Sequence, residues 1–252
     1  MPSLLNSFMP DFIGIGAMRS GTSWLFKNLS KHPQIGLTKK KELHFFDQEI
    51  SKKTIPLLPI EYETKLRYCR YFLQATLCHK VKGEFTPAYA ILPVEKISLI
   101  QSWMPTLKLM FIMRDPVLRA WSHARKDFQK FNGKPLQQAS TDELIEYFKL
   151  PAVADRGNYS ACLENWFKYY KKDRFFIAFT DEITSRPLSL LKEVFEFLGV
   201  DQEIEINQSE VESKVNSRPS LKLPADVHDY LASTLYLQNA HLEDMIERKL
   251  PW

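Results

Sequence analysis

The sequence contains only three cysteines, Cys69, Cys78 and Cys162, and none of them stands in a Cys-x-x-Cys pair. An odd, scattered set neither builds a disulfide framework nor supplies a zinc site, so we expect a reducing compartment and predict a cytoplasmic protein. No apolar run is long enough to cross a bilayer, and residues 1–10 lack the pattern of a signal peptide. A segment of a membrane-anchored parent stays the alternative.

Strong charge of either sign is also missing. The 34 basic and 30 acidic side chains leave a net charge of +4, which suits an anionic ligand but is too weak to indicate nucleic acid. No cluster of metal-ligating residues is evident, and we predict no metal cofactor. A chain of 252 residues with 44% hydrophobic and 25% charged residues fits one globular α/β domain spanning residues 1–252.

The clearest local pattern is a strand, a glycine-bounded turn and a helix between Phe12 and Ser30. The first N–H groups of a helix have no partner in the chain, and the helix dipole adds about half a positive charge there. The turn from Gly16 to Gly21 brings further donors to this point: Arg19, Ser20, Thr22 and Ser23. We interpret the turn as a phosphate cradle, against the alternative of a strand-to-helix turn that binds nothing.

The absence of one residue from this turn narrows the choice of phosphate ligands. Gly16 and Gly21 have the spacing of the nucleotide-triphosphate loop G-x-x-x-x-G-K-[ST], but Thr22 stands where that loop has lysine. The lysine reaches the β- and γ-phosphates, so its absence argues against an ATPase, a GTPase or an ordinary kinase. The cation has moved to Arg19, which we expect beside a single 5′-phosphate.

Strands alternate with helices along the rest of the chain, which predicts a P-loop-type three-layer α/β fold. We expect a central parallel sheet of about five strands with helices on both faces. The expected strands are 12–15, 35–37, 78–84, 107–113 and 174–179, and the expected helices are 22–30, 61–72, 93–103, 116–131, 143–148, 159–170, 187–198, 225–235 and 237–248.

Two further motifs point to chemistry. Glu42 and His44 alternate in an extended segment after three lysines, so both side chains can face the same site, although a solvated basic turn is the alternative. Arg114 ends an apolar strand, where open α/β sheets bind ligands, and Asp115-Pro116 is a typical helix start. Ser122 lies two turns into that helix and is expected to face the same site; the alternative for Arg114 is an ordinary ion pair.

Four separated stretches resemble the PAPS-dependent sulfotransferases, whose donor is 3′-phosphoadenosine 5′-phosphosulfate. They look closest to the branch with bacterial and heparan sulfate enzymes. The stretches are Gly16–Ser23, Lys41–Phe46, Met113–Ser122 and Arg156–Tyr159 with Trp166, and the closing Leu250–Trp252 adds to them. The resemblance implies a sulfotransferase that moves a sulfuryl group from PAPS to a hydroxyl or amine of a small-molecule or glycan acceptor and releases adenosine 3′,5′-bisphosphate (PAP).

The resemblance also assigns roles by position. Glu42 is implied to be the general base, with His44 orienting the acceptor or sharing that role, and Arg19 with Lys41 neutralising the leaving phosphate. The implied donor-binding residues are Arg19, Ser20, Gly21, Thr22 and Ser23 at the 5′-phosphosulfate, Arg114 and Ser122 at the 3′-phosphate, Arg218 in a late loop, and Trp24 and Tyr159 with no end assigned. Residues 132–158 are expected to be a substrate-facing insertion, and 200–223 a loop over the nucleotide.

Two departures from the family pattern matter. Arg19 stands where many relatives have lysine. The positive charge is therefore kept at this position, but the side chain that could donate a proton is not. Phe85 stands where the heparan sulfate 3-O branch has lysine, which puts a polyanionic glycan acceptor in doubt. A P-loop small-molecule kinase and a non-catalytic nucleotide-binding module remain the alternative functions.

Overall fold

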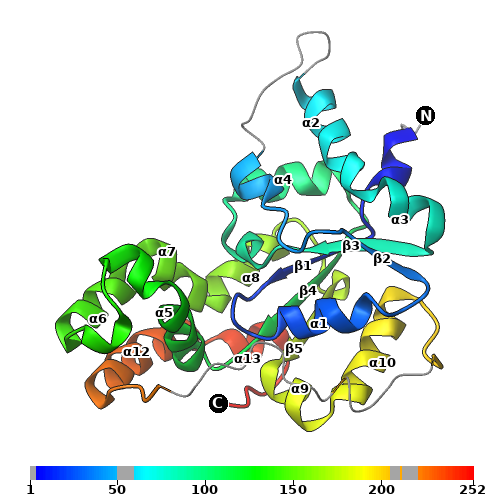
Figure 1. Cartoon of the computed structure of the whole chain (residues 1–252). Coiled ribbons are helices and arrows are strands. Elements are labelled where there is room, and N and C mark those ends of the chain that lie inside the picture. Colours follow the sequence, from blue (N-terminus) through cyan, green and yellow to red (C-terminus); the bar gives the residue numbers. More distant parts are fainter. Residues whose placement is uncertain (1–3, 50–59, 205–210, 212–220) are drawn as a thin grey trace.

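The computed structural model describes residues 4–49, 60–204, 211 and 221–252. These residues contain five strands that form one sheet in the order β2-β3-β1-β4-β5, with every neighbouring pair parallel (Figure 1). The predicted parallel sheet is therefore confirmed. Its strands are β1 (Phe12–Gly16), β2 (Ile35–Leu37), β3 (Val81–Phe85), β4 (Lys108–Met113) and β5 (Phe175–Phe179).

Helices cover both faces of the sheet. Alternate residues of its strands point to opposite faces, and both faces are apolar and have to be buried. In β4, Leu109 and Phe111 join one hydrophobic cluster, whereas Met110 and Ile112 join the other. The second cluster is closed by α1 (Thr22–Leu29) and α10 (Pro187–Leu198). The first is closed by α2 (Ile60–Cys69), α4 (Val94–Trp103), α8 (Tyr159–Phe167) and α13 (Leu242–Ile246).

A third hydrophobic cluster lies beside the sheet, in the lobe at the left of Figure 1. It is built by α5 (Pro116–Asn132), α6 (Thr141–Lys149), α7 (Pro151–Ala154) and α12 (Ala225–Gln238). Residues 132–158 are therefore largely helical and contribute to a core; whether they face an acceptor stays a prediction. The predicted start of α5 is confirmed, because the Asp115 carboxylate accepts a hydrogen bond from the Leu118 N–H at 2.8 Å and Pro116 is the first helical residue.

The structure differs from the prediction at three places. The chain forms a helix, α3 (Leu73–Cys78), up to the point where we predicted a strand to begin, so β3 starts only at Val81. The short helix α9 (Thr180–Ser185) directly follows β5 and was not predicted. The last predicted helix, 237–248, is reduced to α13, since α12 continues to Gln238 and a turn intervenes.

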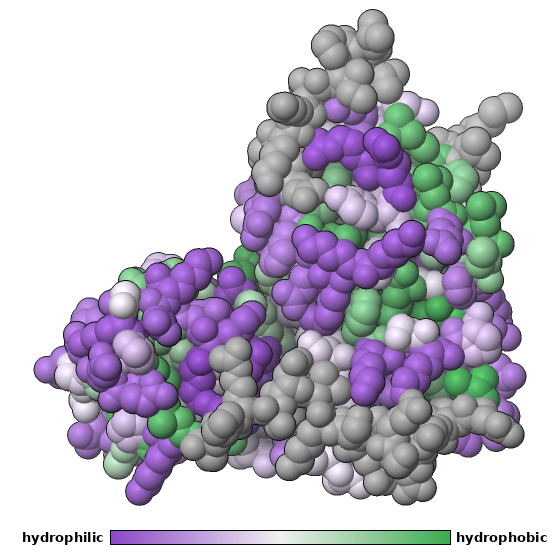
Figure 2. All heavy atoms as spheres, viewed as in Figure 1, coloured by the Kyte–Doolittle hydropathy of each residue, from purple (hydrophilic) through white to green (hydrophobic). Residues whose placement is uncertain are grey.

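The surface of this view is mostly hydrophilic, but apolar side chains reach it around α3, where Leu73 and Leu77 are exposed (Figure 2). Among the described residues, no helix is both long and apolar enough to span a bilayer.

Candidate active site

The glycine-bounded loop lies at the carboxyl end of β1, the middle strand of the sheet. Gly21 has φ = 100°, so the backbone angle favours glycine, and a Cβ atom there would displace the Ile183 Cδ1 atom, which lies 2.3 Å from its position. Gly21 also caps α1 without any side-chain hydrogen bond, and the first turn of α1 carries no acidic residue. The N-terminus of α1 is thus suited to an anion.

The two predicted phosphate motifs meet at this edge of the sheet. The Arg19 Nε atom donates to the Ser122 Oγ atom at 3.1 Å, which joins the loop after β1 to helix α5. The Thr180 hydroxyl lies 3.0 Å from the Ser20 carbonyl oxygen and 3.1 Å from the Met113 carbonyl oxygen, so it holds the ends of both segments together. Thr180, at the start of α9, is a positioning residue that the sequence did not reveal.

Arg114 follows Met113 directly and lies at the same sheet edge. Burial lowers the pKa of its half-buried guanidinium, which still stays charged at neutral pH. The Tyr159 hydroxyl donates to the Arg114 carbonyl oxygen at 2.8 Å, and burial raises the pKa of Tyr159 to about 12. Tyr159 is fully buried in the first hydrophobic cluster, so it acts as a neutral donor that fixes the backbone of Arg114.

Trp24 occupies a different place from the other predicted donor-binding residues. Its side chain is 5% exposed within the second hydrophobic cluster, and its indole Nε1 donates to the Val211 carbonyl oxygen at 2.7 Å. The ring therefore anchors part of the predicted late loop, 200–223. Arg218, also predicted to bind the donor, lies outside the described residues.

The predicted acid–base residues form a chain of ionisable groups. The Lys41 Nζ atom lies 2.6 Å from the Glu42 Oε1 atom, and the His44 ring lies 3.8 Å from Glu42 Oε2 and 2.8 Å from Asp47 Oδ2. Burial raises the pKa of Glu42, but the hydrogen bond and charge of Lys41, with Lys126 and His44, outweigh it and lower the pKa below its ordinary value. Glu42 is thus ionised at neutral pH and able to accept a proton.

Lys126 adds a group that the sequence did not single out. It lies one turn after Ser122 on α5, so one helix face presents a hydroxyl to Arg19 and a positive charge to Glu42. The helix therefore links the loop after β1 to the acid–base segment.

Backbone strain concentrates on these residues. In the described part of the chain, four non-glycine residues have positive φ, and three of them are Arg19 (69°), Glu42 (65°) and His44 (54°). Residues other than glycine rarely adopt a positive φ, and those that are held there cluster at functional sites. The strain is an independent indication that these positions are specified for more than folding.

A buried network holds the acid–base segment against the sheet. Glu84, on β3, is fully buried and accepts hydrogen bonds at 2.6 Å from the Tyr68 and Thr86 hydroxyls. The Thr86 hydroxyl in turn accepts from the Leu43 N–H at 3.0 Å, and the Tyr89 hydroxyl accepts from the Phe45 N–H at 2.9 Å. Burial raises the pKa of Glu84 to about 7.

Phe85, the departure from the heparan sulfate pattern, is fully buried next to this network. Its ring lies in the second hydrophobic cluster against Phe12 and Phe26, and a Cβ atom at Gly14 would meet it at 2.0 Å. The position therefore serves packing beneath α1.

The sheet, the helix without a side-chain cap and the joined segments of Arg19 and Ser122 define an α/β protein whose central strand ends at a helix N-terminus suited to an anion. The chain belongs to the sulfotransferase domain family, whose family model matches residues 9–220. This membership does not favour the small-molecule kinase alternative.

Individual relatives agree with this assignment. The membrane-associated sulfotransferase kil1 of Dictyostelium discoideum is 35% identical over 141 residues, which are 54% of this chain and 27% of that protein. Heparan sulfate glucosamine 3-O-sulfotransferase 5 of Mus musculus is 27% identical over 206 residues, which are 78% of this chain and 55% of that protein. The chain thus spans about a quarter to half of the length of these relatives.

Solved structures share the fold. A sulfotransferase from Alicyclobacillus acidocaldarius superposes with a TM-score of 0.72 at 22% identity, covering 96% of this chain and 97% of that one. Mouse sulfotransferase SULT7A1, in complex with PAP, superposes with a TM-score of 0.51 at 19% identity, covering 96% and 85% of the two chains.

Proposed function

We propose that this protein transfers a sulfuryl group from PAPS to a hydroxyl or amine of an acceptor by metal-independent in-line displacement. The observation that supports this most is the contact of the Arg19 Nε atom with the Ser122 Oγ atom at 3.1 Å. It joins the segments proposed to hold the two ends of one nucleotide. Family membership and the SULT7A1 complex with PAP support the choice of donor.

The residues at the sheet edge fit such a donor. The uncapped N-terminus of α1, with Ser20, Gly21, Thr22 and Ser23, suits the 5′-phosphosulfate. Arg114 and Ser122 suit the 3′-phosphate. A serine hydroxyl has one donor and two acceptor positions, so Ser122 can accept from Arg19 and still donate to a phosphate oxygen.

PAPS, when bound, supplies the sulfuryl group and the leaving phosphate. Arg19 and Lys41 stabilise the charge that grows on that phosphate, as preorganised donors do in a site shielded from water. Glu42 takes the proton of the acceptor as the new bond forms. His44 donates from Nδ1 to the Asp47 carboxylate, which turns Nε2 towards Glu42 and orients it for the acceptor or for a share of the proton.

Two observations bear on the class of acceptor. The named heparan sulfate relatives favour a glycan, whereas the buried Phe85 removes a cation from the position where we noted lysine in that branch. A small-molecule or weakly charged glycan hydroxyl fits both observations. The cytoplasmic location stays a prediction.

A single-turnover assay with ³⁵S-labelled PAPS and a panel of glycans, phenols and aliphatic alcohols tests the proposal. We expect label transfer in the presence of EDTA, and at least a 100-fold slower transfer by Arg19→Ala. Tight PAP binding with no transfer to any acceptor would instead support a non-catalytic nucleotide-binding module. Transfer of phosphate from ATP that requires magnesium would support a kinase.

A further inference from the structure

A second cationic group lies buried in the helical lobe. Arg119, on α5, is fully buried, and all three nitrogens of its guanidinium group lack a hydrogen-bond partner. In the described part of the chain, no carboxylate lies within ion-pairing distance of it. An unpaired buried charge destabilises the fold, and a guanidinium without acceptors is among the most costly polar groups to bury.

The surroundings of Arg119 do not supply the missing acceptors. Four titratable neighbours affect the pKa of Arg119, and none of them is an anion at pH 7. Three are neutral there and one is a second cation: Tyr159, Cys162 and Tyr147, and Arg156. Two neighbouring polar atoms, Tyr147 Oη and His123 Nδ1, are also buried without partners. The guanidinium N–H groups are donors without an acceptor, and they point to an anion at this place.

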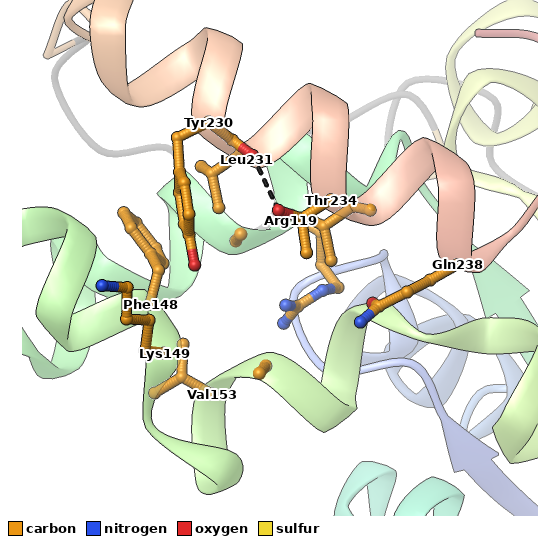
Figure 3. Close-up of a pocket in the computed structure, with 11 residues that line it drawn as sticks. Arg119, Phe148, Lys149, Val153, Tyr230, Leu231, Thr234 and Gln238 are labelled. Atoms are coloured by element: carbon orange, nitrogen blue, oxygen red, sulfur yellow. Dashed lines mark hydrogen bonds between the residues drawn. The ribbon is translucent and has the colours of Figure 1, made fainter.

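A pocket of about 210 Å³ lies beside this arginine, between α5, α6, α7 and α12. Figure 3 shows the guanidinium of Arg119 pointing into the space between Gln238 and the α7 segment that carries Val153, with Tyr230 on the opposite side. The walls are mainly apolar, and they are formed by Ala120, Phe148, Val153, Ala154, Leu231 and Leu235. The pocket therefore combines an apolar chamber with the unpaired cation of Arg119, while the other lining cation, Lys149, is paired with Glu146 at 2.6 Å.

We propose that this pocket binds a small monocarboxylate with an apolar body, whose carboxylate pairs with Arg119. The planar guanidinium fork matches a carboxylate with two parallel hydrogen bonds. A cavity of about 150 Å³ holds benzene, so this pocket accepts an acid of the size of benzoate or hexanoate. The apolar walls disfavour inorganic phosphate or sulfate, which have no apolar body to bury.

Isothermal titration of the whole chain with benzoate and hexanoate tests this site, with benzyl alcohol as the neutral analogue and sulfate as the bare anion. Saturating PAP is present so that the anion site at β1 is occupied. We expect one benzoate per chain, bound at least about tenfold more tightly than benzyl alcohol or sulfate, because hydrogen bonds to charged groups carry this much discrimination.

Two variants locate the binding. Arg119→Met removes the cation at similar volume, and Ala154→Leu fills the chamber while leaving the cation in place; each should weaken benzoate at least tenfold. Lys168→Met is the matched control, since it removes an exposed cation that does not line the pocket and should leave benzoate affinity unchanged. Ala154→Leu locates the site even if PAP does not bind, so the result is independent of the proposed function.

The inference is overturned if the wild-type protein binds neither acid when each is present at about 10 mM. It is equally overturned if Ala154→Leu binds benzoate as wild type does. Should Arg119→Met fail to fold, the Ala154→Leu result and the preference for benzoate over benzyl alcohol decide the question.

Discussion

The buried carboxyl of Glu84 should make the stability of this protein depend on pH in a way that one substitution removes. Glu84→Gln keeps the size of the side chain and an oxygen that accepts from the Tyr68 hydroxyl, but it cannot ionise. Its amide must donate to the Thr86 hydroxyl, which accepts it in addition to the Leu43 N–H. The network that holds the acid–base segment is thus largely kept while its charge is removed.

The magnitude follows from the pKa of Glu84. Burial raises the pKa to about 7, from an ordinary value of 4.5 that applies in the unfolded chain. Protonation therefore favours the folded state; this contribution is complete below pH 4.5 and is lost as pH rises through about 7. At 1.36 kcal/mol for each pH unit, the free energy of unfolding of the wild type should fall by about 3 kcal/mol through this group.

Urea denaturation of both proteins at pH 4.5, 6, 7 and 8 measures the effect. The difference in unfolding free energy, variant minus wild type, should grow by about 3 kcal/mol between pH 4.5 and 8. Glu146→Gln, at an exposed carboxylate on α6, is the control and should give a difference that hardly changes. Parallel curves for Glu84→Gln and wild type would refute the view that burial raises the pKa of Glu84.

The remaining predictions concern the site and its support. Glu42→Gln should lower turnover by about 100- to 10,000-fold, the range for a positioned base, whereas near-normal turnover would assign the base to His44. Arg19→Ala should lower turnover by about 100-fold or more in steady-state assays, and a change confined to the acceptor KM would contradict its role at the leaving phosphate. Thr180→Val should cost about 1–3 kcal/mol in chemical denaturation because the single hydroxyl proton that the Ser20 and Met113 carbonyls share is lost, while Thr184→Val on the exposed side of α9 should cost less than about 0.5 kcal/mol.

Much of the framework could be predicted because it depends on local sequence. Near-continuous apolar runs such as 107–113 indicate buried parallel strands, and Asp115-Pro116 indicates a helix start, whatever the rest of the chain does. The positions of Arg19 and Arg114 at one sheet edge then follow from the rule that parallel strands end at the same edge.

The rest depends on contacts between distant segments. Thr180 is an ordinary threonine until its hydroxyl meets the carbonyl of Ser20, 160 residues earlier. Glu84 lies in the sequence Val-Lys-Gly-Glu-Phe, where a charged residue suggests exposure, and only the tyrosines of α2 and the loop after β3 explain its burial. The resemblance implied that Trp24 binds the donor, but sequence alone could not show that its ring packs in the second hydrophobic cluster; whether it also contacts the donor stays a prediction.

The central claim is that one nucleotide is held by both segments at the carboxyl edge of the sheet. Titration of wild type and Arg114→Ala with PAP and with adenosine 5′-monophosphate tests it most directly. We predict that the variant binds PAP at least tenfold more weakly than the wild type and binds the monophosphate almost as well. The reason is that a charge-assisted contact to the 3′-phosphate is removed. Equal weakening of both nucleotides, or none, would contradict the account.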